Sequence, residues 1–281
     1  MTAIASFYSI SESGNKTLSM ISDSRISWIF PNGTRETYDF SQKIFQLQNS
    51  LDVLGYCGDS FFCLMNLSQI ISYLNNSTVF TNSNSFLAKK NMIFKILEDS
   101  LNLYPSSVEQ DFTIYWNSLI GNEFYSHGFR YLKKNGILKD KKIKFPTTMK
   151  WVFYDGSGGK YYFKALKNLN FEDYNFSRTY FKALVDIIES KIDWQTGGPP
   201  QMISIRKEFN DIQSTSVIYN GRFYLHGIED QLISDPVKVE YRDLDFNFYT
   251  ADYKKRNNYT KSFKRKMNLE NWRNSITKTS S

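Results

Sequence analysis

Thr2 has the clearest potential for chemistry in this chain, because it directly follows Met1 in the opening segment MTAIASFYSI. Aminopeptidases remove an initiator methionine when the next side chain is small, and threonine then becomes the first residue. A threonine hydroxyl is a poor nucleophile until a nearby base takes its proton. The α-amine of the same residue can be that base, since its ordinary pKa of about 7.7 to 8.0 leaves much of it neutral near physiological pH. Thr2 could equally be the plain start of a strand.

The sequence has few histidines and cysteines for metal binding or for histidine- or cysteine-based catalysis. The two histidines, His127 and His226, are too few for a multi-histidine metal site and poorly suit a histidine-based triad. We expect His226, at the end of an apolar strand, to be structural. The two cysteines, Cys57 and Cys63, lie six residues apart in one apolar segment, which is typical of core side chains rather than of a disulfide framework. We therefore expect no metal and no cofactor.

A glycine-rich segment, DGSGGK at residues 155–160, is the one candidate for a phosphate loop. It lacks the Gly-x-x-x-x-Gly-Lys-Ser/Thr spacing of such a loop, and we predict that it lies between two strands rather than before a helix. We therefore favour a turn without phosphate binding.

The positive charge of the chain is concentrated at its end. The net charge is +7, and residues 250–281 alone contain nine lysines and arginines against two acidic residues. A general argument for nucleic-acid binding therefore fails for the rest of the chain. The tail also contains aromatic residues and could grip a single strand by stacking, but we favour a solvated arm that docks on an acidic neighbouring subunit.

The sequence contains no apolar run of the eighteen or more residues needed to cross a bilayer and no secretory signal pattern. We expect a protein without a membrane segment, located in the cytoplasm.

Hydrophobic periodicity predicts a β-rich block followed by two helices in the first hundred residues. Residues 2–10 and 17–22 should form a hairpin, and KIFQL and LDVLGYCGD two further strands. Apolar residues then recur at helical spacing from Ser60, and a second helix should run from Phe86 to a stop near Pro105.

The remaining chain predicts strands around a single helix. Residues 149–166, MKWVFYDGSGGKYYFKAL, read as a hairpin that turns at Asp155-Gly156, and TSVIYNGRFYLHG as a hairpin on Asn220-Gly221. A helix is expected over residues 176–192, and the lysine-rich stretch 133–144 looks like an insertion. This order favours an α+β domain in which helices cover antiparallel sheets.

Several short segments occur in a characteristic order along residues 2–230. They are Thr2, SDSR at 22–25, KIFQL at 43–47, GYCGD at 55–59 and DWQTGG at 193–198. In this order the chain resembles a proteasome β-subunit, a member of the N-terminal-nucleophile (Ntn) hydrolases. The resemblance implies an αββα sandwich, two stacked antiparallel sheets covered by helices, over residues 1–235. Residues 236–281 would be a basic C-terminal extension.

The resemblance also implies roles for individual residues around Thr2. Lys43 would place a positive charge beside the threonine and depress neighbouring pKa values. Asp23 would pair with Lys43, because an ammonium buried without a partner is costly. Asp193 and Thr196, from the family's Asp-x-x-Ser/Thr-Gly-Gly segment, would orient the terminal amine.

The resemblance also implies that two residues of one strand contact the substrate. The Gly55 amide matches the donor that stabilises the oxyanion, and loss of such a donor typically costs about 100-fold to 1,000-fold in rate. Val53, two residues earlier on the same side of the strand, would line a first specificity pocket for apolar residues. The implied reaction is amide hydrolysis of a peptide or protein substrate through an acyl-threonine ester, in a homo-oligomer such as a ring.

An alternative interpretation is an inactive relative that keeps the fold as a scaffold and binds a partner through its tail. The family's Gly-Ser-Gly segment, whose serine supports the active threonine, has no counterpart in ALKNLNFEDYNF at residues 165–176, which favours this alternative.

Overall fold

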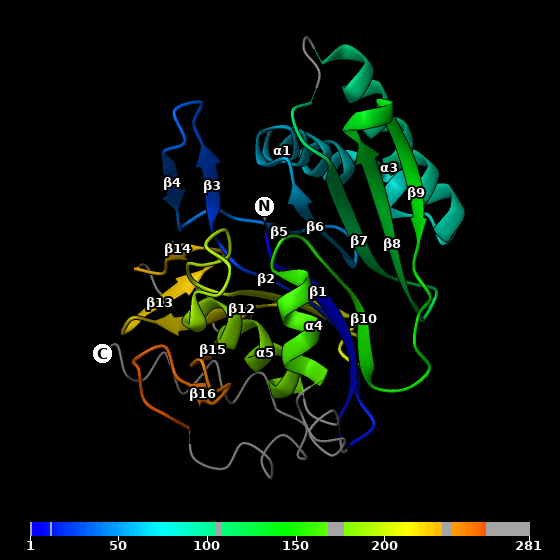
Figure 1. Cartoon of the computed structure of the whole chain (residues 1–281). Helices are drawn as coiled ribbons and strands as arrows, with labels where there is room; N and C mark the ends of the chain where they lie inside the picture. The colour runs from blue at the N-terminus through cyan, green and yellow to red at the C-terminus, as the bar shows by residue number, and fades with distance from the viewer. Residues whose placement is uncertain (1, 12, 105–107, 168–176, 232–237, 257–281) are drawn as a thin grey trace.

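The computed structural model describes residues 2–11, 13–104, 108–167, 177–231 and 238–256 (Figure 1). Helices are α1 Ser60–Asn76, α2 Thr78–Thr81, α3 Phe86–Leu103, α4 Gly159–Lys167 and α5 Ser177–Ser190, with a short 3₁₀ turn at Lys133–Asn135. Strands are β1 Ile4–Ile10, β2 Lys16–Ser22, β3 Ile26–Ile29, β4 Arg35–Tyr38, β5 Ile44–Gln46, β6 Asp52–Gly58, β7 Phe112–Ile120, β8 Glu123–Leu132, β9 Ile137–Lys142, β10 Lys150–Asp155, β11 Gln201–Arg206, β12 Asp211–Tyr219, β13 Arg222–Leu225, β14 Ile228–Glu229, β15 Val239–Arg242 and β16 Phe248–Tyr249.

The strands form two large sheets and one separate hairpin. A nine-stranded sheet runs β10-β1-β2-β11-β12-β13-β14, with β15 beside β12 and β16 beside β15. A five-stranded sheet runs β5-β6-β7-β8-β9, and β3 pairs with β4. The pairs are antiparallel except β12 with β15. The prediction of a mixed fold with antiparallel sheets and helices is therefore confirmed.

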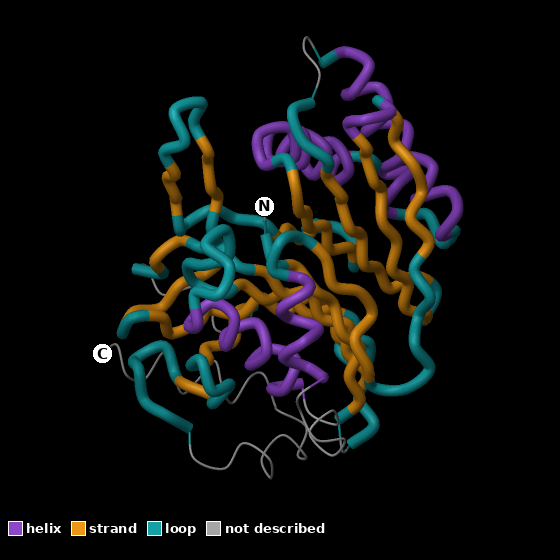
Figure 2. The backbone as a smooth tube through the Cα atoms, viewed as in Figure 1, coloured by secondary structure: helices purple, strands orange, loops and turns teal. Residues whose placement is uncertain are grey.

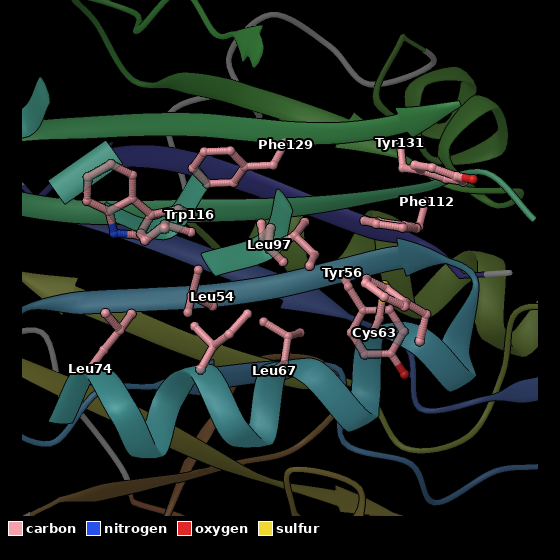
Figure 3. Packing of buried hydrophobic residues seen from close by; sticks show 14 of the residues in the cluster. Leu54, Tyr56, Cys63, Leu67, Leu74, Leu97, Phe112, Trp116, Phe129 and Tyr131 are labelled. Carbon is pink, nitrogen blue, oxygen red and sulfur yellow. The ribbon is translucent and has the colours of Figure 1, made fainter. Parts of the chain in front are cut away.

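Three hydrophobic clusters hold these elements together. One lies between the five-stranded sheet and helices α1 and α3, where Leu54, Leu67, Leu97 and Trp116 meet (Figure 3). A second packs α4 and α5 on the nine-stranded sheet, and a third joins side chains of both sheets. Figure 2 shows the corresponding two groups of helices with the strands between them.

Strand β6 contributes to two of these clusters by alternation. Leu54 and Tyr56 belong to the cluster under α1 and α3, whereas Val53 and Cys57 belong to the cluster between the sheets. Side chains of a strand alternate between its two faces, so a strand buried on both sides has no polar face. Alternate side chains of β6 therefore contribute to the hydrophobic clusters on its two faces.

Polar side chains fix the helices that follow β6. Asp59 accepts a hydrogen bond from the Phe62 amide at 2.9 Å and so caps α1. The buried ammonium of Lys89 on α3 binds Asp52 of β6 at 2.8 Å, and the same carboxylate accepts the indole N–H of Trp116 at 2.7 Å. Helix α3 is therefore tied to the first residue of β6.

Most of the predicted helices and strands are confirmed, but the prediction for residues 149–166 is wrong. The hairpin at β1 and β2, the helices from Ser60 and Phe86, and the turn at Asn220-Gly221 are confirmed. Residues 149–166 are not a hairpin, because β10 ends at Asp155 and α4 begins at Gly159. The lysine-rich stretch supplies β9, an edge strand of the five-stranded sheet.

The C-terminal region is partly built into the domain. Strand β15 pairs with β12, and its side chains Val239 and Tyr241 are buried with Phe223. A boundary at residue 235 therefore does not separate this strand from the nine-stranded sheet. Residues 257–281, which carry most of the tail charge, lie outside the described residues. Within the described part, no helix combines the length and the apolar character that crossing a membrane requires.

The core under α3 makes a prediction about stability. Leu97 is fully buried whereas Leu103, on the same helix, is 83 % exposed. We expect Leu97→Ala to lower the free energy of unfolding by about 2–5 kcal/mol, because it leaves a cavity, and Leu103→Ala to lower it by less than about 0.5 kcal/mol. Urea denaturation of both variants measures this difference. Equal losses would contradict the packing described.

His226 makes a prediction about pH. Its Nε2 lies 3.1 Å from Ser214 Oγ, and its Nδ1 has no hydrogen-bond partner among the described residues. Burial lowers the pKa of His226 to about 4, so at pH 5 the unfolded chain binds a proton there and the folded chain does not. Stability should fall by about 2 kcal/mol between pH 7.5 and pH 5 from this group. His226→Asn, which tolerates the positive φ of this position, should remove that part of the pH dependence in urea titrations; an unchanged dependence would refute the assignment.

Candidate active site

The carboxylate of Asp23 is the centre of a buried hydrogen-bond network near the start of β1. Its Oδ1 accepts the Ala3 N–H at 3.0 Å and the Lys43 ammonium at 2.8 Å. Its Oδ2 accepts the Gly197 N–H at 2.9 Å and the Arg25 N–H at 3.2 Å. Asp23 is fully buried, so these donors replace the water that an ionised carboxylate would otherwise need. One side chain thereby joins four distant segments of the chain.

Lys43 is as deeply buried as its partner. Its side chain is 1 % exposed, and its ammonium also donates to the Arg25 carbonyl. Burial lowers the pKa of Lys43, while the charge of Asp23 acts in the opposite direction. Breaking a buried pair by removing one partner typically costs about 3–5 kcal/mol, because the other charge is left unpaired. The pair therefore ties β5 rigidly to the end of β2.

Thr2 lies against a tight glycine turn that follows β10. Thr2 is 1 % exposed in the chain that carries Met1. Its carbonyl accepts the Gly158 N–H at 3.3 Å. A Cβ on Gly156 would lie 1.9 Å from the same carbonyl oxygen, and the φ of Gly156 is +85°. Only glycine combines this backbone angle with so close an approach.

Asp193 and Thr196 meet the other side of that turn. The Thr196 hydroxyl donates to Asp193 Oδ2 at 2.8 Å, and its amide donates to the Asp193 carbonyl at 3.0 Å. A Cβ on Gly158 would lie 2.6 Å from Thr196 Oγ1 and equally close to the Ala3 side chain. The structure thus brings Asp193 and Thr196 to the start of β1 through the glycine turn.

Gly55 and Val53 lie on the face of β6 that meets the other sheet. A Cβ on Gly55 would come within 2.5 Å of Met20 Sδ and 2.9 Å of Ile4 Cδ1. The absent side chain therefore lets β6 pass close to β1 and β2. Val53 is 1 % exposed and belongs to the cluster between the sheets.

A Gly-Ser-Gly sequence lies at residues 156–158, in the turn between β10 and α4. The glycine-rich sequence DGSGGK predicts a hairpin turn here, but a helix follows it instead of a strand. The hydroxyl of Ser157 is buried and has no hydrogen-bond partner among the described residues. The apolar spacing of Tyr162 and Leu166, which both face the core, was the available signal for a helix after this segment.

Arg25 was also overlooked as a positioning group. Its guanidinium binds Asp39 through two hydrogen bonds, at 2.6 and 2.8 Å, and donates to the Trp194 carbonyl at 2.9 Å. A Cβ on Gly197 would lie 2.5 Å from the guanidinium carbon. Arg25, held by Asp39, therefore binds the 193–198 loop and fixes it next to Asp23.

Gln201 connects the same segments through their backbones. Its side chain is fully buried, accepts the Lys43 N–H at 3.0 Å, and donates to Ser24 Oγ at 2.6 Å and to the Ser41 carbonyl at 2.7 Å. The amide thus fixes the backbone of Lys43, so the ammonium is placed by interactions at both ends of the residue.

The glycine turn yields a prediction with a matched control. Gly14 has a φ of +84° with open space around its Cα, whereas Gly156 has a φ of +85° and a crowded one. Gly14→Ala should lower the free energy of unfolding by about 1 kcal/mol, through the backbone angle alone. Gly156→Ala should lower it by about 1–3 kcal/mol more, because the methyl group forces Thr2 away. Chemical denaturation of both variants decides; similar losses would show that Thr2 does not lie against the turn.

No known family profile matches this chain, and no curated protein matches it significantly. Solved structures nevertheless share its fold. The Anbu Gly-1 mutant from Hyphomicrobium sp. strain MC1 is 13 % identical with a TM-score of 0.51, over 82 % of this chain and 88 % of that one. Anbu, described as an ancestral beta-subunit, from Yersinia bercovieri is 14 % identical with a TM-score of 0.52 over the same shares.

Identities this low show likeness of fold alone. The fold-level part of the resemblance to proteasome β-subunits is thereby supported, and this chain has a proteasome-like fold similar to that of the Anbu proteins.

Proposed function

We propose that this chain is an Ntn hydrolase with an αββα sandwich, a threonine peptidase or amidohydrolase whose nucleophile is Thr2 after removal of Met1. One observation carries the proposal. Asp23 Oδ1 accepts both the backbone N–H that follows Thr2 and the ammonium of Lys43, and both of these charged side chains are buried. A buried lysine held one carboxylate away from a potential N-terminal threonine is difficult to explain by stability alone, because apolar side chains would serve stability at least as well.

The proposed reaction uses the two groups of residue 2. The α-amine takes the hydroxyl proton as the oxygen attacks the scissile carbonyl, and passes the proton to the leaving amine as the C–N bond breaks. An acyl-threonine ester remains, and water hydrolyses it with the same amine as base. The Gly55 amide would donate to the oxyanion. Val53, whose side chain is buried in the cluster between the sheets before substrate binds, would border a pocket for apolar residues.

The surrounding groups would tune and orient the terminal residue. The positive charge of Lys43 favours the deprotonated states of neighbouring groups. Asp193, Thr196 and the Ser157 hydroxyl, which has no hydrogen-bond partner in the described part of the chain, would orient the free amine. No cofactor is required by this scheme.

The resemblance leads to further proposals about context. A peptide or protein would be the substrate, the chain would act in the cytoplasm as a homo-oligomer, and the tail after residue 235 would contact a partner subunit rather than nucleic acid. The same fold without catalysis is the second candidate, and it is favoured by the 1 % exposure of Thr2 in the chain that carries Met1.

Hydrolysis of a general peptide library by the native protein tests the proposal. Intact mass first establishes whether Met1 is absent, since a retained methionine leaves Thr2 without its amine. We expect Thr2→Ala to lose at least about 100-fold in rate, because no hydroxyl remains, and Thr2→Ser to keep measurable activity. Equal hydrolysis by the wild type and Thr2→Ala, or no hydrolysis by a protein shown to lack Met1, would favour the scaffold.

A further inference from the structure

A second cluster of polar groups, partly buried, lies beside the glycine turn and takes no part in the proposed reaction. Lys141 of β9 binds Asp155 at 2.7 Å, and Tyr115 of β7 donates a short hydrogen bond to the same carboxylate oxygen. The ammonium also contacts the Tyr115 hydroxyl. Lys141 belongs to the lysine-rich stretch 133–144, to which the sequence analysis assigned no role.

The geometry of three adjacent strands builds this contact. Tyr115, Gly128 and Lys141 lie opposite one another across β7, β8 and β9. A Cβ on Gly128 would lie 3.1 Å from Lys141 Cβ and 3.4 Å from the Tyr115 ring. The bare glycine lets the lysine side chain lie over the ring, with the ammonium 4.9 Å from its centroid, and reach Asp155 at the end of β10 in the other sheet.

Asp155 connects Lys141 to the glycine turn. Its Oδ1 accepts the Gly156 N–H at 2.8 Å, and its residue pairs with Ile4 across β10 and β1. The next residues of the turn contact Thr2, since the Gly158 N–H donates to the Thr2 carbonyl. The peptide unit between Thr2 and Ala3 is therefore held on both sides. Asp23 with Lys43 holds its N–H, and the turn anchored by Asp155 with Lys141 holds its carbonyl.

We propose that Lys141, with Tyr115, is a positioning residue that holds the Gly156-Ser157-Gly158 turn against Thr2 and so sets the geometry of the nucleophile. This inference rests on the proposed function for its kinetic consequences but not for the clamp itself. Burial raises the pKa of the Asp155 carboxyl, and the hydrogen bonds from Lys141 and Tyr115 outweigh that effect and lower it. Without the ammonium, the half-buried carboxylate would turn toward solvent or take a proton, and the turn would lose its anchor.

Lys141→Met in the full chain tests the clamp, with Lys141→Arg and Lys139→Met as controls. Methionine keeps the length of the stem, arginine keeps the charge, and Lys139 is an exposed lysine on the same strand. Backbone amide exchange by NMR should show the Gly158 and Ala3 amides exchanging about 10-fold faster in Lys141→Met and unchanged in Lys139→Met. In protein freed of Met1, kcat should fall about 10-fold to 100-fold with KM within about twofold, because small displacements of a nucleophile have effects of this size. Lys141→Arg should recover most of both.

The outcomes separate the clamp from the activity. Unchanged amide exchange at Gly158 in Lys141→Met would overturn the clamp, whatever the kinetics. Faster exchange with unchanged kcat would overturn the positioning role. If the wild type shows no Thr2-dependent hydrolysis, the proposed function fails while the exchange data still decide on the clamp. Should Lys141→Met not fold, Tyr115→Phe serves instead, since its ring can keep its stack on Phe153 at 3.8 Å, and it should speed exchange at Gly158.

Discussion

The ion pair between Lys43 and Asp23 is the interaction on which the rest of this structure depends. Both side chains are almost completely buried, and charges in such a place persist only when hydrogen bonds replace their water. Those hydrogen bonds come from the starts and ends of β1, β2, β5 and the loop before β11. Satisfying one carboxylate therefore requires the fold to bring these segments together, next to residue 2.

The glycines explain how so many backbones can meet there. Gly55 lets β6 lie close to β1 and β2, Gly156 lets the turn touch the Thr2 carbonyl, and Gly197 leaves room for the Arg25 guanidinium. In each case a methyl group would fall within 3 Å of another atom. The absence of a side chain at these glycines therefore shapes the site as much as the side chains that are present.

Much of the fold was predictable from sequence because burial leaves a periodic pattern. Strand β6 and helix α1 show clear periodic patterns of apolar residues, and Asn220-Gly221 is a sequence typical of a tight hairpin turn. The hairpin predicted after β10 was wrong for two reasons. Asp155-Gly156 is a sequence typical of hairpin turns, and the apolar residues of YYFKAL are compatible with either a strand or a helix. What fixes this turn is contact with Thr2, more than 150 residues away. Strand β9 was hidden because four of its six residues, ILKDKK, are charged, so the segment lacks the apolar–polar alternation of a half-buried strand. Besides the neighbouring Arg25, the partners of Asp23 come from three distant segments, at Ala3, Lys43 and Gly197, so the sequence order could suggest them only through resemblance.

Covalent labelling provides a direct test of the proposal that the buried Lys43–Asp23 pair activates Thr2 as a nucleophile. A peptide epoxyketone, which needs both the hydroxyl and the free amine of a terminal threonine, is incubated with protein shown by mass to lack Met1. Peptide mapping then locates any adduct in the wild type and in a folded Lys43→Met variant. We expect an adduct on Thr2 in the wild type and a rate of labelling at least about 100-fold lower in Lys43→Met. No adduct on Thr2 in the wild type, or equal labelling of the two proteins, would contradict this proposal.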